Sequence, residues 1–400
     1  MRFQKAHVIR HIKRLLPPGI VFLILGIGLV LKTVFWEFFA LSIYMPFSRR
    51  ISGWLGWFFS LLPIPFAEIG VYLLILFFFG YAIFAIIFSL RSKTAWPLLR
   101  WVADTIFGVV ALLFLFILLW GGNYFAPPLE VRLGLDMTPQ SEEVLFETAL
   151  FHRDRMIEAA ALADRSESFD ILAEASADSM KRLAEDFPEI LGGGHISPPK
   201  RIWTTPLWGR LGVMGIYSPL TGEAFVNPIT TTPFLPAVMN HELAHRLGIA
   251  PEDEANFIAY LAGAQSPHPM VRYSVELMAF LYCLRALENE ELQRVLLEGI
   301  PREIWDDVQN HQEAWASYRG AMSQWAERVN DVYLQAMGQE EGIESYGRVV
   351  DLLIAWKLST PFKCCRERLA DSQAAGTSRQ SAVGSLRETA ATGGVQATRY

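Results

Sequence analysis

The stretch PFLPAVMNHELAHRLGIAPEDEANFIAYLAG, residues 233–263, decides how the chain is interpreted. It contains the pattern H-E-x-x-H, formed by His241, Glu242 and His245. Two histidines four residues apart lie one above the other on a helix, so both imidazoles can bind one metal ion. Glu242 lies beside them, where it can take a proton from a water molecule on that metal. The pattern predicts a helical zinc site with Glu242 as the catalytic base.

The residues after the motif predict a reversal of the chain that brings in a third ligand. Gly248 is the usual residue for a left-handed helix stop, and Pro251 is well placed to begin a new helix. The acidic residues 252–254 then fall in the first helical turn, where the helix dipole favours negative charge. Two histidines, one carboxylate and an open position make up the arrangement of a catalytic zinc site.

The direction in which each acidic side chain points from the helix shows which of them is expected to bind the metal. Glu252 is the preferred third ligand, Glu254 is the alternative, and Asp253 should point elsewhere. Asn256 lies four residues after Glu252. Its side chain can therefore orient a metal-binding histidine without itself binding the metal.

Composition indicates a membrane part followed by a soluble domain. Of 400 residues, 52% are apolar, and the excess is concentrated in the first 125 residues. The formal net charge of -6 gives no reason to expect a nucleic-acid partner. Three cysteines do not make a disulfide framework.

Three apolar runs predict three transmembrane helices within a membrane region at 17–122. Residues 1–16 form a basic N-terminus, and the first run, 17–41, lacks a small-residue cleavage site, so it is predicted to be an uncleaved span. The second run is 69–90 and the third is 105–120. Between the first two runs, residues 42–67 combine arginine with tryptophan and phenylalanine. This composition is typical of a segment that lies in the headgroup region of the membrane.

The distribution of basic residues predicts the orientation. The N-terminus carries five and the 91–101 loop carries three, against two in the longer loop between the first two spans. The positive-inside rule therefore places the N-terminus in the cytoplasm and everything after Gly121 outside it. The expected localisation is the cell membrane, as a multi-pass protein with an extracytoplasmic domain.

The outer domain, 123–360, is predicted to be mainly α, with a small β-hairpin or sheet. Helices are expected at 138–163, 168–187, 272–290, 301–334 and 345–356, and strands at 201–205, 213–217 and 223–227. An exposed strand edge can hold an extended peptide, although a sheet here can equally serve only to cover the helices. Residues 361–400 are predicted to be a disordered tail.

Several separated segments carry a resemblance to a known family. They are YSP at 217–219, TGEA at 221–224, HELAHRLGIAPEDEANFIAYLA at 241–262, VNDVYL at 329–334 and SYGRVVDLL at 345–353. With these segments the chain resembles the bacterial zincin-like membrane family catalogued as domain of unknown function 3810. That resemblance implies a multi-span N-terminus and a metallopeptidase domain whose substrate is unknown. Glu252, Ala255 and Asn256 are also similar to the E-x-x-A-D/N helix of gluzincin peptidases, which implies Glu252 as the third ligand.

These patterns together predict a membrane-anchored zinc metalloendopeptidase that cleaves peptide bonds outside the cytoplasm. Zinc would be held by His241, His245 and Glu252, and Glu242 would pass a proton to the leaving amine. By residue type alone, Tyr346, Arg348, Tyr333 and His268 are candidates for stabilising the oxyanion.

The sequence is also compatible with two other functions. One is a non-catalytic, membrane-anchored binding or scaffold protein that the metal only stabilises, and the other is a zinc hydrolase of cell-wall amides. The expected partners are the lipid bilayer and a peptide or protein substrate. Because the connection at 121–135 is short, that substrate is expected to be membrane-proximal.

Overall fold

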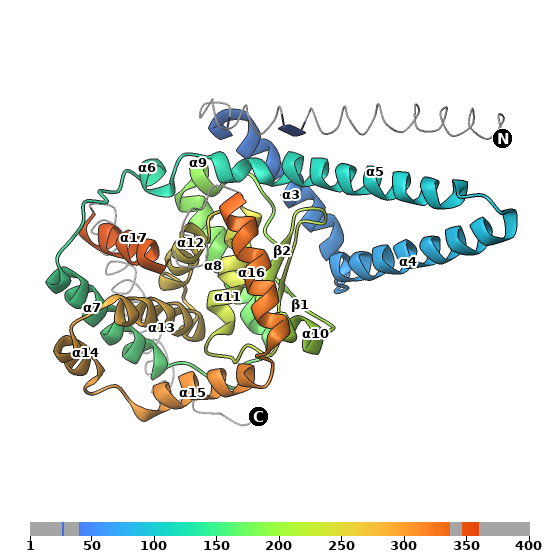
Figure 1. Cartoon of the computed structure of the whole chain (residues 1–400). Coiled ribbons are helices and arrows are strands. Elements are labelled where there is room, and N and C mark those ends of the chain that lie inside the picture. Colours follow the sequence, from blue (N-terminus) through green and yellow to red (C-terminus); the bar gives the residue numbers. More distant parts are fainter. Residues whose placement is uncertain (1–25, 28–39, 337–345, 360–400) are drawn as a thin grey trace, which may run out of the picture.

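The computed structural model describes residues 26–27, 40–336 and 346–359, and it is mostly helical with one small sheet (Figure 1). The predicted mainly α class is confirmed for these residues. The predicted basic N-terminus and disordered tail lie outside the described residues, as does nearly all of the first predicted span.

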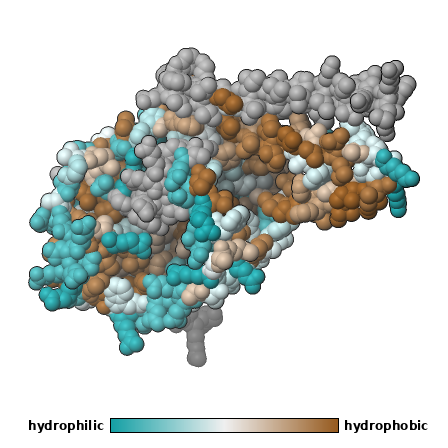
Figure 2. Space-filling model, in the orientation of Figure 1, coloured by the Kyte–Doolittle hydropathy of each residue, from teal (hydrophilic) through white to brown (hydrophobic). Residues whose placement is uncertain are grey.

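Two long helices, α4 (Phe66–Ser92) and α5 (Trp96–Leu119), form an antiparallel arm that projects from the helical body (Figure 1). Both are long and apolar enough to cross a membrane, and almost none of their apolar surface is buried in the protein. Figure 2 shows the arm as a brown, hydrophobic part of the surface beside a largely hydrophilic body. The arm therefore points to membrane association, and it supplies two candidate spans within the described residues, where the sequence predicted three over a longer stretch.

The helix that contains the third predicted span is longer than the apolar run at 105–120, or at 102–120 if Asp104 is counted within it. The helix begins at Trp96, before this apolar run, because two charges inside it have local partners. Arg100 pairs with Asp104 at 3.4 Å one turn later, and the Tyr81 hydroxyl donates to Asp104 at 2.7 Å. A polar pair of this kind does not interrupt a helix, although it interrupts an apolar run.

The segment predicted to lie among headgroups has a second role. It forms the short helix η1 (Ala40–Tyr44) and α3 (Met45–Ser60), and the small residues Ser48, Ser52, Gly53 and Gly56 of α3 are buried against the body. A Cβ on Gly53 would lie 2.5 Å from the backbone nitrogen of His195, so only glycine allows this approach. The small-residue face was missed in the sequence because the aromatic residues of the opposite face dominated the pattern.

Polar side chains fix the arm to the body at both of its inner ends. At the end of α5, Tyr44 and Ser48 donate their hydroxyls to the carbonyl oxygens of Ile117 and Leu119, at 2.7 and 2.6 Å. These carbonyls have no partner within their own helix, and an unpaired one would be costly at a membrane boundary.

The start of α4 is held by two carboxylates. Glu223 accepts hydrogen bonds from the backbone nitrogens of Phe66 and Ala67 at 3.2 and 2.9 Å. Glu68, in the first turn of α4, accepts one from the backbone nitrogen of Trp203 at 2.8 Å. Negative charge at a helix N-terminus is favourable, so these bonds orient the arm relative to the body.

The body is built around helix α11 (Leu235–Arg246), which carries the H-E-x-x-H motif and packs against α8, α12, α13 and the sheet.

The predicted helices of the body are present, although their limits are shifted. The segment predicted as one helix at 301–334 forms two helices, α15 and α16. The remaining helices are η2 (Gly121–Phe125), α6 (Leu129–Leu133), α7 (Glu142–Ala160), α8 (Phe169–Asp186), α9 (Pro188–Leu191), α10 (Thr205–Arg210), α12 (Glu252–Ala264), α13 (Pro269–Ala286), α14 (Glu290–Leu297), α15 (Arg302–Ala316), α16 (Ala321–Ala336) and α17 (Tyr346–Leu358).

The sheet has three short strands in the order β1-β3-β2: β1 (Lys200–Arg201), β2 (Gly215–Ser218) and β3 (Glu223–Val226). β1 runs parallel to β3, and β2 runs antiparallel to it with Gly215 opposite Val226. The strand predicted at 201–205 was too long, because Pro206 in the first turn favours the short helix α10. β2 is an edge strand, and among the described residues no strand pairs with its outer side.

A buried charge cluster joins α7 to α13. Glu276, 1% exposed, contacts His152 at 2.7 Å and Arg155, and these two neighbours lower the pKa of its carboxyl although burial alone would raise it. We expect Glu276→Ala to lower the free energy of unfolding by about 3–5 kcal/mol, because it leaves buried polar groups unpaired. Thermal unfolding of the full chain in detergent measures this, with the exposed Glu174→Ala as a matched control. Equal melting temperatures for the two variants would contradict the prediction.

Candidate metal centre

The two helices of the motif meet through a short reversal. α11 ends at Arg246, and Gly248 has a φ of 85°, the left-handed conformation that favours glycine. Pro251 lies immediately before α12 in an extended conformation, rather than inside the helix. The first residue of α12 is therefore Glu252, and the reversal turns it back towards α11.

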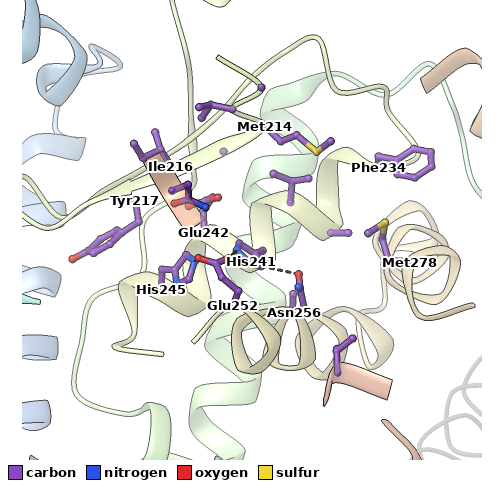
Figure 3. Close-up of a pocket in the computed structure, with 18 of the residues that line it drawn as sticks. Met214, Ile216, Tyr217, Phe234, His241, Glu242, His245, Glu252, Asn256 and Met278 are labelled. Carbon is purple, nitrogen blue, oxygen red and sulfur yellow. Dashed lines mark hydrogen bonds and ion pairs between the residues drawn. The ribbon is translucent and has the colours of Figure 1, made fainter. Parts of the chain in front are cut away.

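Three metal-binding side chains come together at this reversal. One donor atom each from His241, His245 and Glu252 lie within 4.8 Å of one another. The Nε2 atoms of the two histidines are 3.1 and 3.6 Å from the two carboxylate oxygens of Glu252. Figure 3 shows the three side chains pointing toward one another, between α11 and α12.

Both histidines are oriented through their other ring nitrogen. Nδ1 of His241 is 2.8 Å from Oδ1 of Asn256, the dashed contact in Figure 3, and Nδ1 of His245 is 2.8 Å from the carbonyl oxygen of Ile249. A proton on Nδ1 donates in each bond, so Nε2 is the atom that a metal ion would bind in exchange for a proton. The asparagine was predicted in this role. The carbonyl was not, because any residue type offers one.

Charge within the cluster is balanced between the rings and the acid. Burial alone would raise the pKa of Glu252, but the two imidazoles outweigh it and hold that pKa below its usual value. Burial alone would lower the pKa of His245, but Glu252 outweighs it and raises the pKa to about 9. Two histidines with fixed tautomers and one carboxylate are a donor set that zinc accepts, with a position left for a further ligand. These three side chains therefore form a group that could hold a metal ion, and their chemistry fits zinc.

Glu242 lies beside the cluster, against the edge of the sheet. It is buried, and burial raises its pKa to about 7 despite the two nearby histidines. A Cβ on Gly215 would lie 2.4 Å from Oε1 of Glu242, so β2 and this carboxyl are in direct contact. A carboxyl whose pKa is near neutrality can both accept and donate a proton at the pH of most cells.

The other two acids of the helix start point away from the cluster. Glu254 accepts from the backbone nitrogen of Leu129 and from Arg132, both at 2.9 Å. Asp253 pairs with Arg348 at 2.7 Å. Glu254 thus has structural partners, and Arg348, a predicted oxyanion stabiliser, is held on an acid outside the cavity.

Of the remaining oxyanion candidates, Tyr333 alone among the described side chains lines the cavity around the cluster. His268 pairs with Glu167 at 3.3 Å and lies elsewhere, and the side chain of Tyr346 is outside the described part. The Tyr333 hydroxyl is 3.1 Å from that of Tyr124, a second cavity residue that the sequence did not single out.

The cavity has a volume of about 830 Å3 and is bordered by β2, α11, α12 and α16. Two aromatic contacts in its wall were not predicted. The ring of His311 stacks on Phe234 at 4.0 Å, and burial lowers the pKa of His311 to about 4. The ring of Trp120 meets that of His245 edge-on at 5.8 Å. A tryptophan at the end of an apolar run is typical of a membrane interface, and that was the available signal.

Comparison with known proteins gives a family but no relative of known activity. Neither a curated protein nor a solved structure matches the chain. A family model described as "protein of unknown function (DUF3810)" matches residues 43–354, from within η1 to within α17. The match covers most of the chain, including both candidate spans, the sheet and the candidate metal centre. The chain therefore belongs to the DUF3810 family.

Proposed function

We propose that the protein is a membrane-anchored zinc metalloendopeptidase of the gluzincin type, with its catalytic domain outside the cytoplasm. One observation carries the proposal: donor atoms of His241, His245 and Glu252 lie within 4.8 Å of one another beside the buried carboxyl of Glu242. Zinc bound there would supply Lewis acidity, which acidifies water and polarises a carbonyl group.

The chain's own residues account for the proton transfers and for charge stabilisation. Glu242 takes a proton from the attacking water and later gives it to the departing amine, a double role that its raised pKa suits. Among the predicted candidates, Tyr333 is the one proposed to donate to the developing oxyanion, because its side chain lines the cavity around the cluster.

The open edge of β2 offers a place for an extended peptide. The backbone nitrogen of Asn227 donates to the carbonyl oxygen of Met214 at 2.7 Å, which fixes the alternation of hydrogen bonds between β2 and β3. By that alternation the backbone groups of Gly215 and Tyr217 face away from β3, toward the open edge. An added strand would therefore pass directly beside Glu242. This favours a peptide substrate over a wall amide.

Gly215→Ala tests the contact between the strand and the base. We expect zinc content to stay the same and hydrolysis to fall at least about tenfold, since the new methyl group displaces the carboxyl of Glu242 from its place. Gly320→Ala is the matched control, because a Cβ there meets open space. Unchanged hydrolysis in the Gly215 variant would show that the close contact between Gly215 and the carboxyl of Glu242 is not needed for activity.

Metal analysis and proteolysis of the purified full chain test the function itself. The wild type should contain about one zinc ion per chain and cleave a denatured protein, and a chelator should stop cleavage. His241→Ala should lose both properties, whereas His268→Ala, which changes a histidine outside the cavity, should keep both. Zinc without hydrolysis of any peptide would support a scaffold instead, and hydrolysis of wall fragments alone would support the amide hydrolase.

A further inference from the structure

The wall of the catalytic cavity includes the end of a candidate membrane helix. Phe116, in the last turn of α5, and Trp120, directly after it, line the same cavity as the metal cluster. Phe116 also contacts Tyr333 of α16 ring to ring, at 6.2 Å, and Trp120 contacts His245. The metal centre is therefore one side chain away from the end of the arm.

The length of the arm sets the depth of this contact. The 24 residues of α5, at about 1.5 Å each, make a helix of about 36 Å, slightly longer than the roughly 30 Å hydrocarbon core of a bilayer. Phe116 precedes the end of α5 by three residues, so an α5 that crosses the bilayer would place it at the edge of the hydrocarbon. The cavity would then begin at the level of the lipid headgroups.

Aromatic rings at this level match those of a membrane interface. Trp120 packs on Tyr217 at 5.0 Å and on Tyr124 at 6.3 Å, and Tyr124 packs on Tyr333 at 6.0 Å. Tryptophan and tyrosine are the residues enriched where hydrocarbon meets water. Here the rings that lie at the end of the span also form one side of the catalytic cavity.

The rim of the cavity carries exposed apolar side chains. On α16, Trp325, Val329 and Val332 are 55%, 48% and 66% exposed, and their sequence neighbours Ala326, Asn330 and Tyr333 line the cavity. On β2 and just before it, Ile216 and Met214 are also exposed and line the cavity (Figure 3). Exposed apolar side chains are unfavourable in water, but beside a bilayer they can contact its apolar interior.

We propose that the substrate is a polypeptide anchored in the same bilayer, and that the site cleaves it in the segment that leaves the membrane. This inference rests on the proposed peptidase function. The anchored chain would rise along α5 past Phe116, pair with the open edge of β2 and reach Glu242 within a few residues of the lipid. A lipid molecule offers no peptide groups to that edge, so the strand favours a polypeptide.

The test uses full-length protein and single-span peptides placed together in lipid nanodiscs. Each peptide carries the same randomised segment. In the first it directly follows the span, and in the second a rigid helical spacer of about 20 residues lifts it about 30 Å above the lipid. Both peptides share one disc with the enzyme, so their effective concentrations are alike. Mass spectrometry locates the cleavage sites and also follows the lipids.

We expect cleavage of the first peptide at least about tenfold faster than of the second, at sites next to the span. Equal rates for the two peptides, or cleavage only in the lifted segment, would overturn the inference while leaving a working peptidase. Hydrolysis of lipids without hydrolysis of either peptide would also overturn it.

A second readout does not depend on catalysis. In the Glu242→Gln variant, a photo-crosslinking residue at Asn330, which lines the cavity from α16, should capture the first peptide and not the second. The matched control places the crosslinker at Glu174, on the exposed surface of α8, where neither peptide should be captured. If the first peptide is captured at Asn330 but the wild type does not hydrolyse it, the peptidase proposal fails and the proposed position of the substrate still holds. Equal capture of both peptides would count against that position.

Discussion

Replacing Glu242 with glutamine should reduce peptide hydrolysis by about 10²–10⁴-fold while zinc content stays at the wild-type level. The loss follows from removing the group that is proposed to accept and return the proton, since glutamine cannot take a proton at neutral pH. Zinc should remain because the converging donor atoms belong to His241, His245 and Glu252. The measurements are metal content of the purified full chain and the rate of cleavage of one denatured protein.

The fold should tolerate this change, which makes the result easy to interpret. Burial already disfavours the charged carboxyl of Glu242, as its raised pKa shows, and a neutral amide of the same shape does not carry that cost. The melting temperature should therefore stay the same or rise. Glu174→Gln, on the exposed surface of α8, is the matched control and should leave hydrolysis unchanged. Loss of zinc from an intact Glu242→Gln protein would assign this residue to metal binding instead of proton transfer.

The parts of the site that the sequence predicted are those encoded within about 16 consecutive residues. A spacing of four places His241 and His245 on one face of a helix, and Gly248 forces the reversal that returns Glu252 to them. Asn256 follows from the same periodicity, one turn after Glu252. Local geometry of this kind depends on backbone dihedrals and helix period, which a short sequence specifies.

The parts that the sequence did not predict are contacts between distant segments. Trp120 reaches His245, and Gly215 reaches Glu242, only because the arm and the sheet are docked on α11. Nothing in the local pattern around Trp120 distinguishes a ring in lipid from a ring packed against His245. Arg348 shows the converse: its residue type suggested catalysis, but Asp253 and Glu130 hold it elsewhere.

The small residues of α3 illustrate a further limit. Gly53 and Gly56 allow the helix to approach the body closely, yet the neighbouring Trp54 and Phe58 made the segment resemble an interfacial one. Both faces are present on the same helix. A sequence pattern shows which face is apolar, but packing against the body depends on what that body presents, and this is decided by the rest of the fold.

The third metal ligand can be decided by comparing two neighbouring acids. Glu252→Ala should reduce zinc content to background, because it removes the carboxylate that faces both imidazoles. Glu254→Ala should keep zinc, because that carboxylate binds Leu129 and Arg132 instead. Metal analysis of both full-length variants measures the difference directly.

Glu254→Ala should lose stability even though it keeps zinc. Glu254→Ala leaves the buried guanidinium of Arg132 without its partner carboxylate, so the free energy of unfolding should fall by about 3–5 kcal/mol. Adding a chelator should lower the melting temperature of the wild type and of Glu254→Ala, but not that of Glu252→Ala, which has no zinc to lose. If Glu254→Ala proves too unstable to purify, Glu254→Gln retains an acceptor for Leu129 and should still bind zinc. Retention of zinc by Glu252→Ala together with its loss from Glu254→Gln would assign the ligand to Glu254.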